Sequence, residues 1–519
     1  ATTEIYTLSL HDALPIWRPN GRAEIELGTP RSLLYTPAMP TDDAHEKPAD
    51  GSQLRSPWSF VPVLYYLQGL PVMIIQGMAG VMYTKLGVDP GPMALWTNIL
   101  KLPWMLKPLW GPLVELNSTK RKWIIAMQAL IAVGLFASAY AITQSAFFSL
   151  SLGVFLVVAF LSSTHDIAAD GFYLLALSKE RQAFFVGIRS ACFRLASLTA
   201  TFALVYIAGD IEERTGNIPH SWFVALMVGA TIYGLFAFVN AFALPRPGLD
   251  VPGKTLPKEE GEAVPFVEAF AAFFRQDRIF WILGFILFFR FGESMISTMS
   301  GPFLVAEPEA GGLGISTKAT GALGGAVGVL SLTIGGILGG WLISKKGIRK
   351  TIWPMVFSLN LPNLFYIWLG TTRPESKMDA LLQSAPENLP IFSLDYLSYA
   401  GSVLTTAITD PVGIAIAVDQ FGYGFGFSAY LVYLMYVSQA SRYKTSSYAI
   451  ATGLMALGAL IAGSVSGYIV QGMSSAMPGN GYLGFFWVVM ACTIPGMITL
   501  FFIRSEEHTS ELQSLRHLV

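Results

Sequence analysis

Charge is what this sequence has least of. Only 13% of its 519 residues are charged, whereas soluble domains carry about 25%. The net charge is −1, so the chain lacks the basic excess typical of nucleic-acid-binding proteins. Cysteine is also scarce, because Cys192 and Cys492 are the only two and both lie in apolar segments. This excludes a disulfide scaffold, and we expect neither a metal nor a cofactor.

Apolar residues are abundant in their place. The chain is 53% hydrophobic, with 50 Gly and 35 Phe, and its mean hydropathy is +0.52. Apolar segments of about 20 residues recur between short polar loops, which is the length that a helix needs to cross a bilayer. A lipid-exposed segment must satisfy its own backbone hydrogen bonds. We therefore predict an all-α polytopic membrane protein with the bilayer as its main surroundings.

The two ends of the chain differ from the rest. Residues 1–16 (ATTEIYTLSLHDALPI) and 504–514 (RSEEHTSELQS) resemble translated sequencing-adapter sequence. We interpret 1–16 and 504–519 as artefact tails, which places the native chain within 17–503, and the alternative is a pair of genuine tails. Segments of this kind are set aside before the fold is considered.

The remaining chain divides into six apolar segments, a linker and six more. An N-terminal tail (1–57) precedes a first bundle (58–244), a cytoplasmic linker with an amphipathic helix (245–278) and a second bundle (279–503). The expected spans lie near 58–84, 92–114, 123–143, 146–176, 183–208, 222–244, 279–305, 318–343, 351–371, 409–438, 446–470 and 481–503. This pattern predicts twelve transmembrane helices in two six-helix bundles.

Basic residues orient these spans. If both termini are cytoplasmic, most of the Lys and Arg in loops fall inside, including the runs at 120–122 and 345–350, as the positive-inside rule requires. The outer loops then hold only Lys85, Arg214, Lys318, Arg373 and Lys377. Because the basic runs at 345–350 and 441–444 both belong inside, an even number of spans must separate them. We therefore interpret residues 372–408 as an outer insertion with a surface helix.

Two loops repeat each other. GPLVELNSTKRK (111–122) and GWLISKKGIRK (340–350) each place Gly at a helix end with basic residues beyond it, which indicates an internal repeat. Both resemble the Gly-x-x-x-Asp-Arg-x-Gly-Arg-Arg signature of the major facilitator superfamily. Glu115 stands for the acid in the first copy, and Ser344 replaces it in the second.

Six further segments, in order, resemble the AmpG-type permeases of that superfamily. They are GLP (69–71), LPWMLKPLWGP (102–112), STHDIAAD (163–170), FRLAS (193–197), FFRFGES (288–294) and DQFGYGFG (419–426). The resemblance implies a secondary transporter that imports muropeptides with protons in the bacterial inner membrane. His165 in place of a frequent Gln, the added Lys101 and the insertion leave other oligosaccharides, sugar acids and peptides open. We expect a monomer.

Ionisable residues at membrane depth usually have functions. In the first bundle, the expected fourth span carries Asp166 and Asp170 on one helix face, and the fifth carries Arg189 and Arg194. At 1.5 Å per residue, Asp170 matches Arg189 in depth and Asp166 matches Arg194. We predict these two ion pairs, which either lock the spans together or take part in transport.

The second bundle carries Arg290, Glu293 and Asp419 near the middle of the membrane. Arg290 and Glu293 are three residues apart and can pair on one helix. We predict a substrate or proton site here, and the alternative is a role in helix packing.

Other polar residues are candidates for lining a cavity. They are Tyr65, Gln68, Lys101 and His165. Gln68 precedes Pro71, which we expect to interrupt the first span. Lys101 has Glu115, Asp166 or the transport pathway as possible neighbours, and Lys107 is expected to reach the membrane surface.

The sequence is compatible with three functions. We predict a proton-coupled importer of a small polar solute. The alternatives are a sensor that has kept the transporter fold and, less favoured, a membrane enzyme acting on lipid-linked substrates. The long outer loop has acids but no His or Cys, which disfavours the enzyme. GLDVPGKT (248–255) matches the letters of a phosphate-binding loop, but it lies in a Pro-rich linker rather than between a strand and a helix. We interpret it as a chance match.

Overall fold

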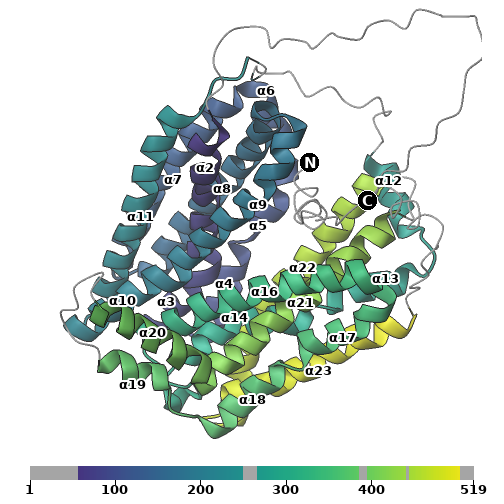
Figure 1. The fold of residues 1–519 in the computed structure, drawn as a ribbon. Coiled ribbons are helices and arrows are strands. Elements are labelled where there is room, and N and C mark those ends of the chain that lie inside the picture. Colours follow the sequence, from purple (N-terminus) through teal and green to yellow (C-terminus); the bar gives the residue numbers. More distant parts are fainter. Residues whose placement is uncertain (1–55, 249, 251–265, 385–393, 440–443, 503–519) are drawn as a thin grey trace, which may run out of the picture.

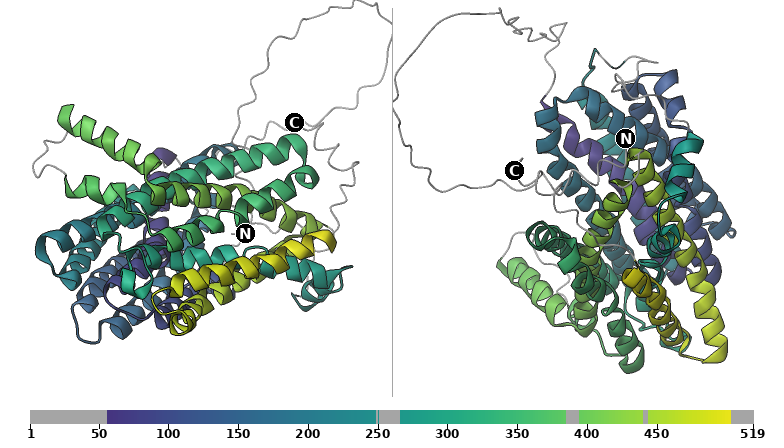
Figure 2. Two further views of the ribbon diagram at one scale, coloured as in Figure 1. Left: turned by 90° about the horizontal axis from the view of Figure 1, so that it is seen from below. Right: turned by 90° about the vertical axis from the view of Figure 1, so that its right-hand side faces the viewer.

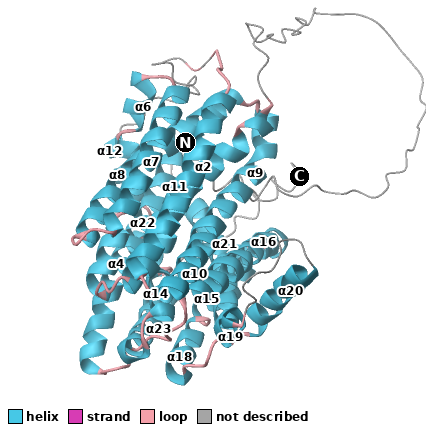
Figure 3. Cartoon of the chain, turned by 90° about the vertical axis from the view of Figure 1, so that its left-hand side faces the viewer, coloured by secondary structure: helices cyan, strands magenta, loops and turns pink. Residues whose placement is uncertain are grey.

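A computed structural model describes residues 56–248, 250, 266–384, 394–439 and 444–502. Both terminal tails, residues 249 and 251–265 of the linker, and residues 385–393 and 440–443 lie outside these ranges, so the interpretation of residues 1–16 and 504–519 stays a prediction. The described part of the chain is helical, without a strand (Figure 3).

The first half of the chain forms one group of helices. Its elements are η1 (Pro57–Ser59), α2 (Val61–Met73), η2 (Ile74–Met78), α3 (Ala79–Lys85), α4 (Pro90–Ile99), α5 (Leu102–Leu106), η3 (Lys107–Leu109), α6 (Gly111–Asn117), α7 (Lys120–Ile142), α8 (Phe147–Ala176), α9 (Lys179–Leu198), η4 (Thr199–Leu204), α10 (Val205–Thr215) and α11 (Ile218–Ala243).

The second half forms the other group. It comprises α12 (Phe266–Phe274), α13 (Ile279–Phe288), α14 (Phe291–Val305), η5 (Pro308–Ala310), α15 (Thr317–Thr320), η6 (Gly321–Val327), α16 (Gly328–Lys346), α17 (Ile348–Asn360), α18 (Asn363–Thr372), α19 (Lys377–Gln383), α20 (Leu394–Thr409), α21 (Pro411–Gln439), α22 (Lys444–Ala476) and α23 (Gly481–Phe502).

Ten of the described helical runs are long and apolar enough to cross a membrane. The number becomes eleven if Gly401–Thr409 and Pro411–Gln439, bent by 77°, are taken as one span. The expected second span does not pass as one run, because it is divided into α4, α5, η3 and α6. Pro103 and Pro108 fall within this stretch, and proline removes a backbone donor and breaks regular helix. Large apolar side chains on the outside, such as Leu235, Ile337 and Phe501, are those of a protein solvated by lipid.

The two halves meet at one end of the molecule and diverge towards the other (Figure 1). We call the first the closed end, where α10, α15 and α19 lie, and the second the linker end, where α6 and α12 lie. Between the halves, α4 packs on α22, α3 on α14, and α10 on α15. A buried apolar core crosses this junction, with Leu135 and Trp222 on one side and Phe303 and Phe486 on the other.

Three spans contain π-helical stretches, namely η2, η4 and η6. A π-helical stretch inside an α-helix marks a local widening that is frequent at functional sites. η4 packs against both η2 and η6, so the widened turns meet at the junction of the halves. The expected interruption at Pro71 is wrong, because α2 runs through Pro71 to Met73 and the departure from α-geometry is η2, one turn later.

The linker is anchored where it leaves α11. Asp250 accepts hydrogen bonds from the backbone N–H groups of Lys120 at 2.7 Å and Arg121 at 3.0 Å. These are among the N–H groups that an α-helix leaves without partners at its N-terminus. The Arg121 side chain donates to the carbonyl oxygens of Ala241 and Leu244 at the end of α11. Asp250, the third letter of the phosphate-loop match, therefore caps α7.

The insertion predicted at 372–408 contains two helices, α19 and α20. They lie at the closed end beside α10 and α15 (Figure 3). Seen from that end, α20 stands at the margin of the molecule (Figure 2). The end of α20 does not continue straight into α21, because the chain bends by 77° between Gly401–Thr409 and Pro411–Gln439.

Candidate transport site

Asp170 of α8 forms the better enclosed of the ion pairs in the first half. Its Oδ1 lies 2.8 Å from Arg189 Nη2 of α9, and both side chains are less than 10% exposed. The Tyr65 hydroxyl of α2 donates to the same oxygen at 3.3 Å. The Arg189 guanidinium also lies over the rings of Tyr65 and Tyr173, 4.0 and 4.4 Å from their centroids. The predicted contact between Asp170 and Arg189 is confirmed.

The predicted contact between Asp166 and Arg194 is wrong. Asp166 pairs instead with Lys107 Nζ in η3. The break in the second span brings η3 beside α8, where Trp110 Nε1 donates to Thr164 Oγ1 at 3.2 Å. Lys107 therefore binds Asp166 rather than extending to the membrane surface as expected. Arg194 is half-buried and has no salt bridge within the described residues.

His165 lies inside the first bundle, fully buried. Its Nε2 is 3.0 Å from Gln128 Nε2 of α7, and Gln128 Oε1 accepts from Asn240 Nδ2 of α11 at 3.1 Å. This chain of polar contacts joins α7, α8 and α11. His165, which stands where AmpG-type permeases often have Gln, therefore binds neighbouring helices. Gln68 is half-buried, and its Oε1 has no hydrogen-bond partner among the described residues.

In the second half, Arg290 occupies the break between α13 and α14. Its Nη2 lies 2.9 Å from Glu293 Oε2 and 2.8 Å from the Tyr423 hydroxyl. The guanidinium stands over the rings of Tyr423 and Phe427, at 4.9 and 4.5 Å. Glu293 lies in the first turn of α14, where the helix dipole favours an anion. The predicted pairing of Arg290 with Glu293 is confirmed.

Asp419 of α21 has a different environment. It is 3% exposed and accepts hydrogen bonds from the Tyr366 hydroxyl at 3.3 Å and from Gln420 Nε2 at 2.9 Å. In the described part of the chain it has no salt bridge. Asp419 is thus a buried acid held by neutral donors only.

Lys101 links the two halves. It stands between α4 and α5, and its Nζ donates to Asn98 Oδ1 at 2.8 Å. Asn98 Nδ2 in turn lies 3.4 Å from Thr298 Oγ1 of α14. Asp166, which we considered as its partner, binds Lys107 instead. Lys101 is thus connected to the second half through Asn98.

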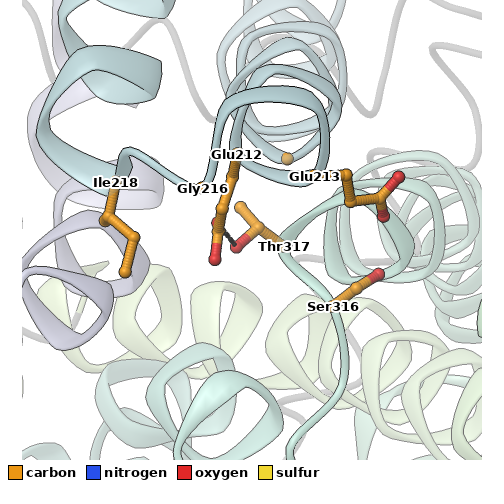
Figure 4. A pocket seen from close by; sticks show the side chains of 7 residues that line it. Glu212, Glu213, Gly216, Ile218, Ser316 and Thr317 are labelled. Atoms are coloured by element: carbon orange, nitrogen blue, oxygen red, sulfur yellow. Dashed lines mark hydrogen bonds between the residues drawn. The ribbon is translucent and has the colours of Figure 1, made fainter.

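A second polar contact closes the junction at the closed end. Lys318 Nζ lies 2.9 Å from Asp210 Oδ1 and 3.3 Å from Glu213 Oε2 of α10. Thr317 Oγ1 donates to Glu212 Oε2 at 2.7 Å, as Figure 4 shows. A pocket of about 290 Å³ lies here, lined by Gly209, Glu212, Glu213, Gly216, Ile218, Ser316 and Thr317.

Sequence reasoning missed the neutral partners. It found the charged residues because charge is rare in apolar segments. Tyr366, Tyr423, Asn98 and Gln128 carry no comparable signal, since a neutral polar side chain in an apolar segment does not by itself indicate which residue it binds. Within the described residues no group of three or more His, Cys, Asp or Glu is placed to hold a metal ion.

The helical architecture and its buried charges define a polytopic membrane transporter. Residues 63–385 match the Major Facilitator Superfamily, which is more than half of the chain, so the protein belongs to that superfamily. This places it among secondary transporters rather than enzymes.

Relatives extend over most of the chain at low identity. An uncharacterised protein of Haemophilus influenzae is 23% identical, covering 84% of this chain and 91% of its own. The putative transporter AmpG 4 of Rickettsia conorii is 21% identical, covering 86% and 95%. The anhydromuropeptide permease of Escherichia coli K12 is 22% identical, covering 85% and 78%. The resemblance to AmpG-type permeases is thus confirmed at the level of distant homology.

Solved structures share the fold. A bacterial homologue of the human lysosomal transporter Spinster, inward-facing and unoccupied, superposes with a TM-score of 0.56 at 16% identity, covering 87% of this chain and 96% of that one. A D-xylose–proton symporter gives 0.56 at 13% identity, covering 86% and 97%.

Proposed function

We propose that this protein is a proton-coupled importer of a small polar solute, such as a muropeptide, an oligosaccharide or a sugar derivative. The observation that carries the proposal is the contrast between two buried acids in the second half. Glu293 has a cation, Arg290, at 2.9 Å, whereas Asp419 has only neutral donors. Burial favours the protonated form of a carboxyl group, and a nearby cation favours its ionised form.

A cycle follows from this contrast. Asp419 is the proposed proton carrier, and Glu293 exchanges between Arg290 and a second partner as the halves move. Lys101 is a candidate for that second partner, because its hydrogen bond to Asn98 connects it to α14, the helix that carries Glu293. Asp166 and Asp170 have their own cations, so we assign their pairs to a supporting part in the cycle.

The orientation belongs to the same proposal. Placed in a bacterial inner membrane with both termini in the cytoplasm, the linker end faces inwards and carries Arg121 and Lys345. The closed end then faces the periplasm. The halves diverge towards the linker end in Figure 1, which supports a state open to the cytoplasm. We retain 58–244 and 279–503 as the two bundles and 245–278 as the linker, and we expect a monomer.

Uptake into proteoliposomes tests the coupling. Glu293→Gln and Asp419→Asn should abolish accumulation driven by an imposed pH gradient, because neither side chain can then exchange a proton, while Glu293→Gln leaves solute counterflow partly intact. The test solutes are a muropeptide, a neutral oligosaccharide and a sugar acid. Glu309→Gln is the matched control, since Glu309 is exposed at the closed end.

Two outcomes would count against this assignment. If both variants fold and keep full pH-driven uptake, the coupling acids lie elsewhere, and Asp166 and Asp170 become the next candidates. If the purified protein binds a solute but catalyses neither uptake nor counterflow, the alternative of a sensor with a transporter fold is favoured.

A further inference from the structure

The insertion at the closed end makes a continuous set of contacts with the junction between the halves. α19 begins beside α21, where the buried Asp410 carboxylate joins the two helix ends. Asp410 Oδ2 accepts from Ser376 Oγ and from the Met378 N–H, each at 2.9 Å. Its Oδ1 accepts from the N–H groups of Val412 at 2.8 Å and Gly413 at 3.1 Å. Asp410 thereby fixes the start of α19 relative to α21.

One turn further on, α19 holds α15. Asp379 Oδ1 accepts from the Ser316 hydroxyl, and Oδ2 accepts from the Ser316 N–H at 3.1 Å. Ser316 is also the N-cap of α15, because its Oγ accepts from the Ala319 N–H at 3.1 Å. Met378 and Leu382 of the same short helix are buried. A carboxylate that binds two groups of one residue fixes both its position and its orientation.

α15 is an element that needs such support. It has four residues and is followed directly by the π-helical η6, which contains Gly321, Gly324 and Gly325. α15 is the first turn of the continuous helical run Thr317–Lys346, where backbone N–H groups have no partner within the helix, and the glycines of η6 add conformational freedom that must be lost. The backbone of this segment therefore depends on its tertiary contacts.

The residues that α15 presents are those that bind the other half. Thr317 and Lys318 directly follow Ser316, and they contact Glu212, Asp210 and Glu213 of α10 at 2.7 to 3.3 Å. Lys318 is 6% exposed. Figure 4 shows Ser316 and Thr317 on the segment of the chain that faces Glu212 and Glu213 of α10. A displacement of Ser316 would move both binding residues together.

We propose that Asp379 is a positioning residue of the transport cycle: from the insertion, it holds Ser316 so that Thr317 and Lys318 bind α10 and keep the closed end shut. The contact determines how much of the population has its closed end open. It depends on the chain being a transporter with two moving halves, and not on the proposed solute or on proton coupling.

Distance measurements between spin labels test this directly. Labels at Ser145 and Ala310, in exposed closed-end loops of the two halves, report separation at that end once Cys192 and Cys492 are replaced by Ala. Asp379→Ala should increase the long-distance population several-fold. Asp379→Asn should stay near the parent distribution, because an amide can accept from the N–H and donate to the hydroxyl of Ser316. Glu375→Ala, an exposed acid of the same insertion, should change nothing.

A merely structural role predicts another result. In that case Asp379→Ala lowers the melting temperature but leaves the distance distribution of the folded protein unchanged, which would overturn the proposal. If Asp379→Ala does not fold, Ser316→Ala removes the same hydroxyl bond and serves in its place. Lys318→Met should itself open the closed end, and adding Asp379→Ala to it should cause little further shift. Additive shifts would also refute the proposal.

Discussion

At the scale of single residues, the two ion pairs of α8 differ in how completely they are enclosed. The side chains of Arg189 and Asp170 are 8% and 9% exposed, whereas Lys107 and Asp166 are 18% and 11% exposed. Removing one partner of a buried pair leaves an unpaired charge and costs about 3–5 kcal/mol, even though the pair itself contributes little net stability. The Asp170–Arg189 pair therefore fits a permanent link between α8 and α9. The Asp166–Lys107 pair, at the break in the second span, is easier to separate.

The partner of Asp166 can be established by a double-mutant cycle. Asp166→Asn and Lys107→Met should each lower the free energy of unfolding by up to about 3–5 kcal/mol. The double variant should lose clearly less than the sum, because neither charge is then left unpaired. Reversible unfolding in mixed micelles measures the three values. Arg194→Met is the comparison: its effect should add to that of Asp166→Asn, and coupling between these two would contradict the contact seen here.

The residue-level outcome shows what depth can and cannot predict. Pairing by depth succeeded for Asp170 and Arg189, which lie on consecutive antiparallel helices. It failed for Asp166 because a third segment competes for it, and the position of that segment depends on a proline-broken span whose path is set by tertiary packing. The tyrosines around Arg290 and Asp419 were beyond prediction for the same reason. Their hydroxyls are brought to the charges by helices distant in sequence.

At the scale of elements, the spans were predictable because each must match the thickness of a bilayer. Every expected span coincides with a helix or a run of helical segments to within a few residues at most ends, since hydropathy alone decides where a chain enters lipid. The breaks and π-helical stretches were not predictable, except where proline is concentrated. η4 and η6 arise where the two halves pack together, and η2 packs on η4 within the first half. No local sequence pattern specifies these contacts.

The cap on α7 gives a prediction at this scale. Asp250→Ala should lower thermal stability by about 0.5–2 kcal/mol, the usual cost of losing a helix N-cap, because two N–H groups lose their acceptor. Asp250→Asn should recover part of the loss. Thermal unfolding of the purified protein in detergent measures both.

A variant of the next basic residue in the linker, Lys254→Ala, separates the two interpretations of the linker motif. Nucleotide binding that is abolished by Lys254→Ala would revive the phosphate-loop interpretation. The capping role predicts no nucleotide binding by the parent protein and no change in stability for Lys254→Ala.

At the scale of the whole molecule, the halves approach most closely through glycines. A Cβ atom at Gly209 of α10 would lie 2.2 Å from the Lys318 backbone nitrogen, and one at Gly467 of α22 would lie 1.8 Å from the Pro90 carbonyl oxygen. Contacts below 3.0 Å against backbone atoms cannot be relieved by a side-chain rotation. The closed end is therefore held by polar bonds between α10 and α15 and also by backbone packing that only glycine permits. Both features would have to separate when this end opens.

This packing leads to a prediction about the conformational equilibrium. Gly467→Ala should push α4 and α22 apart, because the added methyl group meets the backbone at Pro90, and should increase the population with an open closed end. Gly453→Ala in the same helix is the matched control, since nothing lies within 4 Å of its Cβ position. There the substitution should only raise helix stability, by about 0.5–1 kcal/mol. Labels at Ser145 and Ala310 measure the separation. Identical distance distributions for the two folded alanine variants would mean that close packing at Gly467 does not hold the halves together.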